Sequence, residues 1–217
     1  TNMFNEAVNL IGENGTTYNS SHIGKDYAKI DKTSTPGYLT KNYPKGVYAK
    51  LYDTNSDSMG DTLVLNDTPL FTYEGTLIND YENKDNNSIQ TENGTELPIW
   101  FKYNNTDVKT IEIMDDIEPV SGYYLLGDFR ALKEIKNINK INTKNIKNMS
   151  YMFYATGSTS TDFNLDLGNN FDTSSATTMQ KMFYCTGSGS TIMSLDLGDK
   201  FDTSDVVNME GMFNATG

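Results

Sequence analysis

Residues 149–178 read MSYMFYATGSTSTDFNLDLGNNFDTSSATT, and residues 179–208 read MQKMFYCTGSGSTIMSLDLGDKFDTSDVVN. The two segments align without a gap and 17 of the 30 aligned positions are identical, which fixes the period of the repeat at 30 residues. A third copy, MEGMFNATG, begins at Met209. Repeats of this length are typical of solenoids, in which each unit buries its apolar face by stacking on its neighbours. The repeat therefore predicts the architecture of this part of the chain.

Apolar residues follow two patterns within each unit. Met149, Met152 and Phe153 fall at i, i+3 and i+4, which places them on one face of a short helix. Residues 165–167, Leu-Asp-Leu, alternate as in a short strand whose leucines point to one side and whose aspartate points to the other. Strand, turn, helix and turn make one coil of a short leucine-rich-repeat-like solenoid. The sequence thus predicts an α+β fold.

Three regions are expected along the chain. Residues 1–45 contain a helical pattern over residues 3–11, followed by an irregular linker rich in Gly, Pro, Ser and Thr. Residues 46–119 contain several β patterns and predict a small, mainly antiparallel capping region. Residues 120–217 form the solenoid, and we expect it to continue beyond 217, because the last repeat lacks a polar cap.

These motifs resemble the repeat of a known bacterial family. Residues 148–153 (Asn-Met-Ser-Tyr-Met-Phe), 195–198 (Leu-Asp-Leu-Gly) and 201–209 (Phe-Asp-Thr-Ser-Asp-Val-Val-Asn-Met) are similar to the repeat of the BspA-like leucine-rich-repeat surface proteins. The resemblance covers residues 46–217, although the units here are longer and only Cys185 fills one of the family's Cys positions. It implies a non-catalytic recognition or adhesion module that is extracellular, on the bacterial cell surface.

The composition weighs against several classes of function. A net charge of −12 and a pI near 4.4 argue against binding nucleic acid or an anionic membrane surface. The sequence contains no transmembrane run of about 20 apolar residues. The only histidine, His22, has no catalytic motif around it, and the single cysteine, Cys185, excludes an intrachain disulfide. We therefore expect no catalytic residues and no enzymatic activity.

The predicted strands carry the candidate ligand-binding residues. These are Asn164, Asp166, Ser194 and Asp196, which recur in register. Such a strand face would present a regular polar surface to a protein or glycan on another cell or matrix. The aspartates could equally serve only to keep this face soluble. A second interpretation of the whole chain is a structural subunit of a surface fibre, pilus or layer, in which further copies of itself stack end to end.

The loop between the first two predicted strands is a candidate calcium site. Its oxygen-bearing residues at alternate positions are Asp53, Asn55, Asp57 and Asp61. This spacing resembles the start of a calcium-binding loop, but the sixth position is Ser58 instead of Gly, and the twelfth is Val64 instead of Glu. A solvated hairpin tip is the favoured interpretation, and no cofactor besides calcium is suggested.

Overall fold

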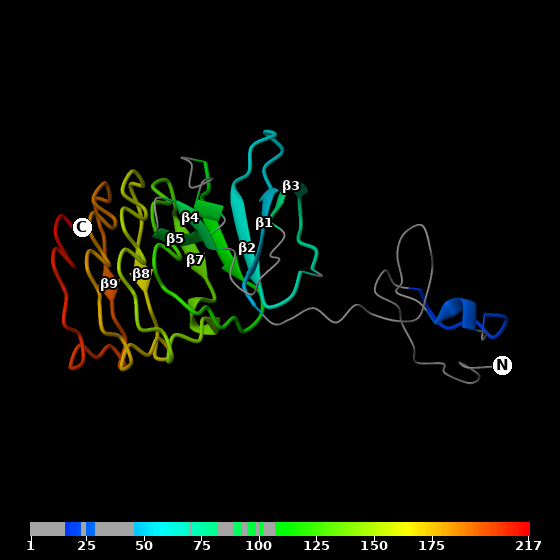
Figure 1. Ribbon diagram of the computed structural model, residues 1–217. Helices are drawn as coiled ribbons and strands as arrows, with labels where there is room; N and C mark the ends of the chain where they lie inside the picture. The colour runs from blue at the N-terminus through cyan, green and yellow to red at the C-terminus, as the bar shows by residue number, and fades with distance from the viewer. Residues whose placement is uncertain are drawn as a thin grey trace. The chain divides into compact units, whose positions relative to one another are not determined.

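The structure is a computed structural model that describes residues 16–22, 25–28, 46–69, 71–81, 89–92, 95–98, 100–101 and 107–217 (Figure 1). The chain separates into two compact units, Thr1–Pro44 and Lys45–Gly217. The described part of the first unit contains a short 3₁₀ helix, η1 (Lys25–Tyr27), and the ring of His22 stacks on that of Tyr27. The helix expected over residues 3–11 lies outside the described residues.

The second unit is mainly β and contains a mixed five-stranded sheet with the order β3-β1-β2-β6-β7. Its strands are β1 (Tyr48–Asp53), β2 (Thr62–Asn66), β3 (Thr76–Tyr81), β6 (Thr110–Ile113) and β7 (Glu134–Lys136). Strand β1 pairs antiparallel with both β2 and β3, whereas β2, β6 and β7 run parallel. Strands β4 (Ile89–Glu92) and β5 (Thr95–Pro98) form a separate antiparallel hairpin.

Both faces of strands β1 and β2 are buried, which explains why these strands are so apolar. Leu63 and Leu65 point into the main hydrophobic core, while Val64 points into a smaller cluster on the other face with Tyr52 and Phe71. Successive side chains of a strand point to opposite faces, so burial on both sides requires an unbroken apolar run. The Thr-Leu-Val-Leu segment of β2 meets that requirement.

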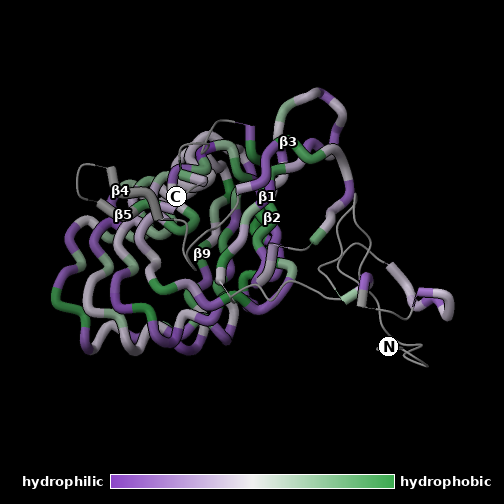
Figure 2. The backbone as a smooth tube through the Cα atoms, turned by 45° about the vertical axis from the view of Figure 1, so that its right-hand side comes forward, coloured by the Kyte–Doolittle hydropathy of each residue, from purple (hydrophilic) through white to green (hydrophobic). Residues whose placement is uncertain are grey.

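The repeats form successive coils that lie side by side (Figure 1). Strand β8 (Leu165–Asp166) pairs parallel with β9 (Leu195–Asp196), so Leu165 lies opposite Leu195. Bridges between Asn148, Thr178 and Asn208 continue the same register. Around each coil the chain alternates between hydrophobic and hydrophilic stretches (Figure 2). The 30-residue period thus places equivalent residues of neighbouring coils beside each other.

The Met-x-x-Met-Phe segments are not helical, contrary to the prediction. Residues 150–159 and 180–189 are runs of tight turns, with positive φ angles at Tyr151 (60°) and Ala155 (53°). The N–H of Met152 donates to the carbonyl of Met149 in the same coil, while the N–H of Phe153 donates to Met182 of the next coil. Paired coils lie about 4.8 Å apart, whereas packed helices need about 8–10 Å. A helix at this position would not fit that spacing.

The predicted burial of these segments is confirmed even though their backbone differs. Met149, Met152 and Phe153 are completely buried, as are Met182 and Phe183 of the next coil. Tandem turns return the chain to the same side at intervals close to those of a helical turn. The i, i+3, i+4 spacing therefore identified the core residues but not the backbone conformation.

Strand pairing within residues 46–119 is mainly antiparallel, as predicted, and the region is continuous with the coils. Strand β6 lies between β2 and β7 and pairs parallel with both, so a single sheet runs from this region into the first coil. The bridge between Ile117 and Ile141 extends the parallel contact. The indole N–H of Trp100 donates to the carbonyl of Leu125 in the first coil, at 3.0 Å. Trp100 thereby takes the place of a preceding coil at this carbonyl.

Candidate functional site

The predicted ligand-binding residues lie together on the exposed side of β8 and β9. Asp166 and Asp196 are direct neighbours in the parallel pair, and both are exposed. Ser194 donates both its N–H and its hydroxyl to the side-chain oxygen of Asn164, at 2.8 and 2.9 Å. Each aspartate accepts a bond from the N–H of the glycine two residues later. These side chains therefore stabilise the turns after the strands and still present free carboxylate oxygens along the coils.

The predicted calcium loop is held together by its own carboxylates. Asp61 is buried and accepts hydrogen bonds from the N–H groups of Thr54 and Asn55 and from the hydroxyls of Thr54 and Thr62. Burial acts to raise the pKa of Asp61, but these hydrogen bonds outweigh it and hold the pKa below its usual range. The carboxylate therefore serves as the acceptor that closes the base of the loop.

The other residues of this loop bond in the same way. Asp53 is buried and accepts bonds from the N–H groups of Asn55, Ser56 and Ser58. The exposed Asn55 and Asp57 each accept a bond from the N–H two residues later. Within the described residues, no group of three or more His, Cys, Asp or Glu side chains is arranged to hold a metal ion. These contacts favour the hairpin tip over the calcium site.

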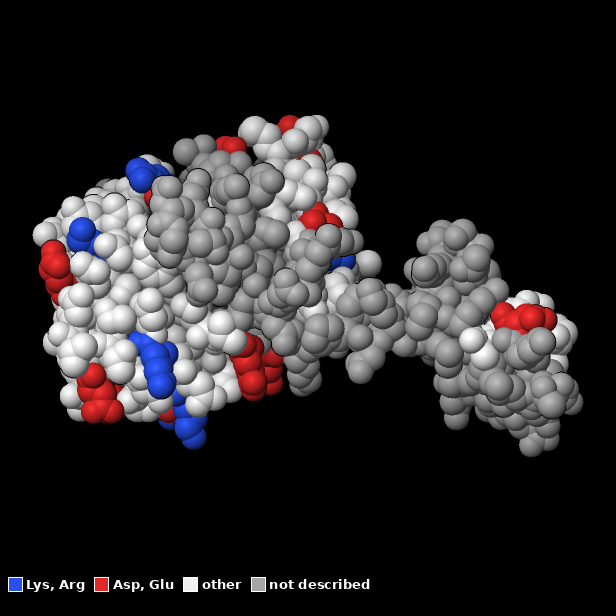
Figure 3. Space-filling view, in the orientation of Figure 1, with Lys and Arg blue, Asp and Glu red and all other residues white. Residues whose placement is uncertain are grey.

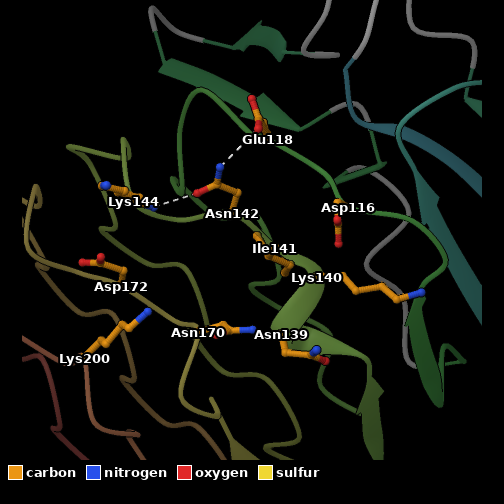
Figure 4. A pocket seen from close by; sticks show the side chains of 10 residues that line it. All are labelled: Asp116, Glu118, Asn139, Lys140, Ile141, Asn142, Lys144, Asn170, Asp172 and Lys200. Atoms are coloured by element: carbon orange, nitrogen blue, oxygen red, sulfur yellow. Dashed lines mark hydrogen bonds between the residues drawn. The ribbon is translucent and has the colours of Figure 1, made fainter.

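A polar groove of about 320 Å³ crosses three successive coils (Figure 4). Its lining residues are Asp116, Glu118, Asn139, Lys140, Ile141, Asn142, Lys144, Asn170, Asp172 and Lys200. Half of them belong to two rows of equivalent positions. One row contains Lys140, Asn170 and Lys200, and the other contains Asn142 and Asp172, each 30 residues from the next. Residues at equivalent positions of successive repeats therefore line this groove, as they line the strand face.

Opposite charges meet in the groove. Asp172 lies between Lys144 and Lys200 (Figure 4). The hydroxyl and N–H of Ser174 both donate to Asp172 and, together with the two lysines, hold its pKa below the usual range. At the start of the groove the amide of Asn142 donates to Glu118 at 3.2 Å. The groove thus offers ammonium groups, carboxylates and amides to a polar ligand.

The groove was not predicted from the sequence, although the spacing of some of its residues could have indicated it. The 60-residue separation of Lys140 and Lys200 is twice the period of the repeat. The contact with Glu118 was not predictable in this way, because the bridge between Ile117 and Ile141 spans 24 residues instead of 30. On the face of the coils shown in Figure 3, the visible charged residues lie mainly near the edges.

The fold defines a mainly β protein whose C-terminal part is a stack of repeated coils. Residues 125–217, which comprise most of that stack, match the model of a family described as Mycoplasma protein of unknown function, DUF285. Comparisons with curated proteins and with solved structures gave no match. In the described part of the chain, no helix has the length and apolar character needed to cross a membrane.

Proposed function

We propose that residues 120–217 form a leucine-rich-repeat-like solenoid of the BspA type, and that the chain is a non-catalytic recognition and adhesion module at the bacterial cell surface. The observation that carries this proposal is the register of the coils. Equivalent exposed side chains, such as Asp166 and Asp196, recur side by side on a backbone fixed by hydrogen bonds to the next coil. A rigid backbone with exposed rows of polar groups is suited to binding an extended partner.

The chemistry of the polar rows supports binding rather than catalysis. The carboxylates of Asp166, Asp172 and Asp196 each accept bonds from neighbouring groups of their own turn. Catalysis of hydrolysis would require a nucleophile and a base within hydrogen-bonding distance, or two carboxylates in distinct environments. The repeated aspartates instead have near-identical surroundings in successive coils, which is expected of a binding surface for a protein or glycan outside the cell.

Binding to arrays of glycans and extracellular host proteins tests this proposal. The 217-residue chain is compared with two variants, Asp166→Asn/Asp196→Asn on the strand face and Asp172→Asn/Lys200→Gln in the groove. We expect saturable binding to at least one ligand of the array. Loss of binding in one variant only would identify the recognition surface. An intact, folded protein that binds nothing on either array would contradict the recognition function.

A second candidate is a structural subunit of a surface fibre, pilus or layer. Met209 and Phe213 are each almost half exposed, at 46% and 47%, although their counterparts Met179 and Phe183 are completely buried by the next coil. The edge that they form resembles one side of an interface between coils. Light scattering over a range of concentrations tests this candidate: growth of the molar mass, abolished by Phe213→Ser, supports it. A concentration-independent monomer argues against it.

A further inference from the structure

A cluster of half-buried tyrosines lies on the turn-rich side of the coils, away from the strand face. We call Tyr123, Tyr124, Tyr151, Tyr154 and Tyr184 the tyrosine strip. Tyr124 stacks on Tyr151 with ring centroids 4.8 Å apart, and Tyr154 stacks on Tyr184 at 5.3 Å. Tyr123 meets both Tyr124 and Tyr151 edge to face. The rings are thus fixed against one another across three coils.

One lysine lies over two rings of the tyrosine strip. The ammonium group of Lys181 lies 5.9 Å from the ring centre of Tyr151 and 5.6 Å from that of Tyr184. Cation–π contacts of this kind stabilise the position of a lysine without neutralising its charge. No described carboxylate forms an ion pair with Lys181. The strip therefore has a positive centre in a chain whose net charge is −12.

The backbone below the strip is disfavoured for the side chains it carries. Tyr124, Tyr151 and Lys181 have positive φ angles of 51°, 60° and 51°. Gly211 occupies the equivalent position of the following coil, with φ 62°. Left-handed conformations are unfavourable for bulky residues. The turn itself accepts glycine, so the aromatic rings and the lysine are not needed to form it.

The hydroxyl groups of the strip are available as hydrogen-bond donors. Burial is the largest cause of a raised pKa at Tyr123 and Tyr124, with smaller contributions from neighbouring tyrosines and, at Tyr124, from Asp128. Like any tyrosine hydroxyl, both are protonated at neutral pH. Tyr73 shows the contrast, because its hydroxyl donates to Glu112 at 2.7 Å. Within the described part of the chain, the hydroxyls of the strip form no such hydrogen bond.

We propose that the tyrosine strip and Lys181 bind a glycan that carries a carboxylate. A sugar ring presents C–H groups and hydroxyls together, which matches the rings and hydroxyls of tyrosine. The carboxylate of an acidic sugar would pair with the ammonium of Lys181, and the rigid rings lose little conformational entropy on binding. This inference rests on the proposed recognition function and assigns it a ligand class and a surface.

Titration with sialyllactose, and with lactose as the uncharged match, tests the inference. We expect the wild-type chain to bind sialyllactose more tightly than lactose. Lys181→Gln should weaken sialyllactose binding about tenfold, because a charge-assisted bond is lost. Tyr154→Phe/Tyr184→Phe should weaken it several-fold while keeping the ring stack. Lys133→Gln removes the same charge at an exposed position outside both candidate surfaces, so it is the matched control and should bind as the wild type does. Lys144→Gln tests the groove as the competing site.

The outcomes separate this inference from the proposed function. Sialyllactose binding that depends on Lys144 but not on Lys181 would overturn the assignment to the strip and leave recognition intact. Equal binding of lactose and sialyllactose, or no binding of either, would overturn the acidic-sugar assignment. A protein ligand captured through the same tyrosines, without sugar binding, would also overturn it. Thermal unfolding of each variant checks that a loss of binding does not reflect loss of the fold.

Discussion

The ring of Phe183 stacks on that of Phe153 with centroids 5.5 Å apart and planes only 2° from parallel. Phe213 continues the stack at 5.4 Å. Both Phe153 and Phe183 are completely buried. The stack runs along the axis of the coils, so each ring joins its own coil to the neighbouring coils and contributes to both contacts.

Replacement of the middle ring should therefore be costly. Phe183→Ala removes a buried aromatic side chain and opens a cavity between coils, which we expect to lower the free energy of unfolding by about 3–5 kcal/mol. Urea unfolding followed by circular dichroism measures the change. Phe213→Ala, at the half-exposed end of the stack, is the control and should cost markedly less. Equal losses for the two variants would contradict the role assigned to the stack.

A threonine in each coil bonds to the backbone of the preceding coil. The hydroxyl of Thr186 is completely buried and donates to the carbonyl of Phe153 at 2.6 Å. Thr186→Val keeps the shape but leaves that carbonyl without this bond, so we expect a loss of about 1–3 kcal/mol in chemical unfolding. Thr177, whose bond to Lys147 is exposed, provides the matched control. Thr177→Val should change stability by less than Thr186→Val.

Two glycines with almost the same φ angle should respond very differently to alanine. Gly157 and Gly168 have φ angles of 67° and 66°. A Cβ at Gly157 would lie 2.2 Å from the ring of Phe163, whereas one at Gly168 would meet nothing within 4 Å. Gly168→Ala should lower the stability only by the cost of a left-handed alanine, about 1–2 kcal/mol. Gly157→Ala should lower it clearly more, because the clash adds to that cost. Thermal melts of the two variants measure the difference, and similar melting temperatures would refute the clash.

Acid should weaken the loop closed by Asp61. Its hydrogen bonds hold the pKa below the value of about 3.9 in an unfolded chain. The folded protein therefore gains stability from ionised Asp61 above about pH 4, and loses it as the pH falls through the folded-state pKa. Asp61→Asn should be less stable than the wild type at pH 7, and the difference between their free energies of unfolding should become smaller toward pH 2. A difference that does not change with pH would show that ionisation of Asp61 is unimportant.

The sequence predicted the period and the core, because both depend on side chains that repeat. Met152 and Phe153 were placed on the buried face, and Leu165 was predicted to lie in a short strand. The turns were not predicted, because an i, i+3, i+4 spacing fits a helix as well as tandem turns. The positive φ of Tyr151 could not be predicted either, because tyrosine is not a residue type that indicates a left-handed conformation. Local patterns also carry no information about which distant strands pair.

Of the candidate surfaces, the strand face could be predicted from the sequence and the tyrosine strip could not. Asp166 and Asp196 were predicted to share a face, since a period of 30 residues and a strand pattern suffice for that inference. The tyrosine strip was not predicted, because Tyr124 meets Tyr151 through a shorter first interval of 27 residues. Only the fold shows that the first coil is shorter than the others.

The backbone hydrogen bonds at the start of each tandem-turn segment run in one direction. At each contact between coils, four N–H groups of this segment point toward the carbonyls of the higher-numbered coil; Met149, Tyr151, Phe153 and Ala155 supply one such set. Within this segment the aligned peptide groups leave unpaired N–H groups at the end toward which they point, whereas the N–H groups of Gly157 and Thr177 point the other way. The edge formed by residues 209–215 lies at that end. Any group that docks there must supply hydrogen-bond acceptors, so two such edges cannot pair with each other.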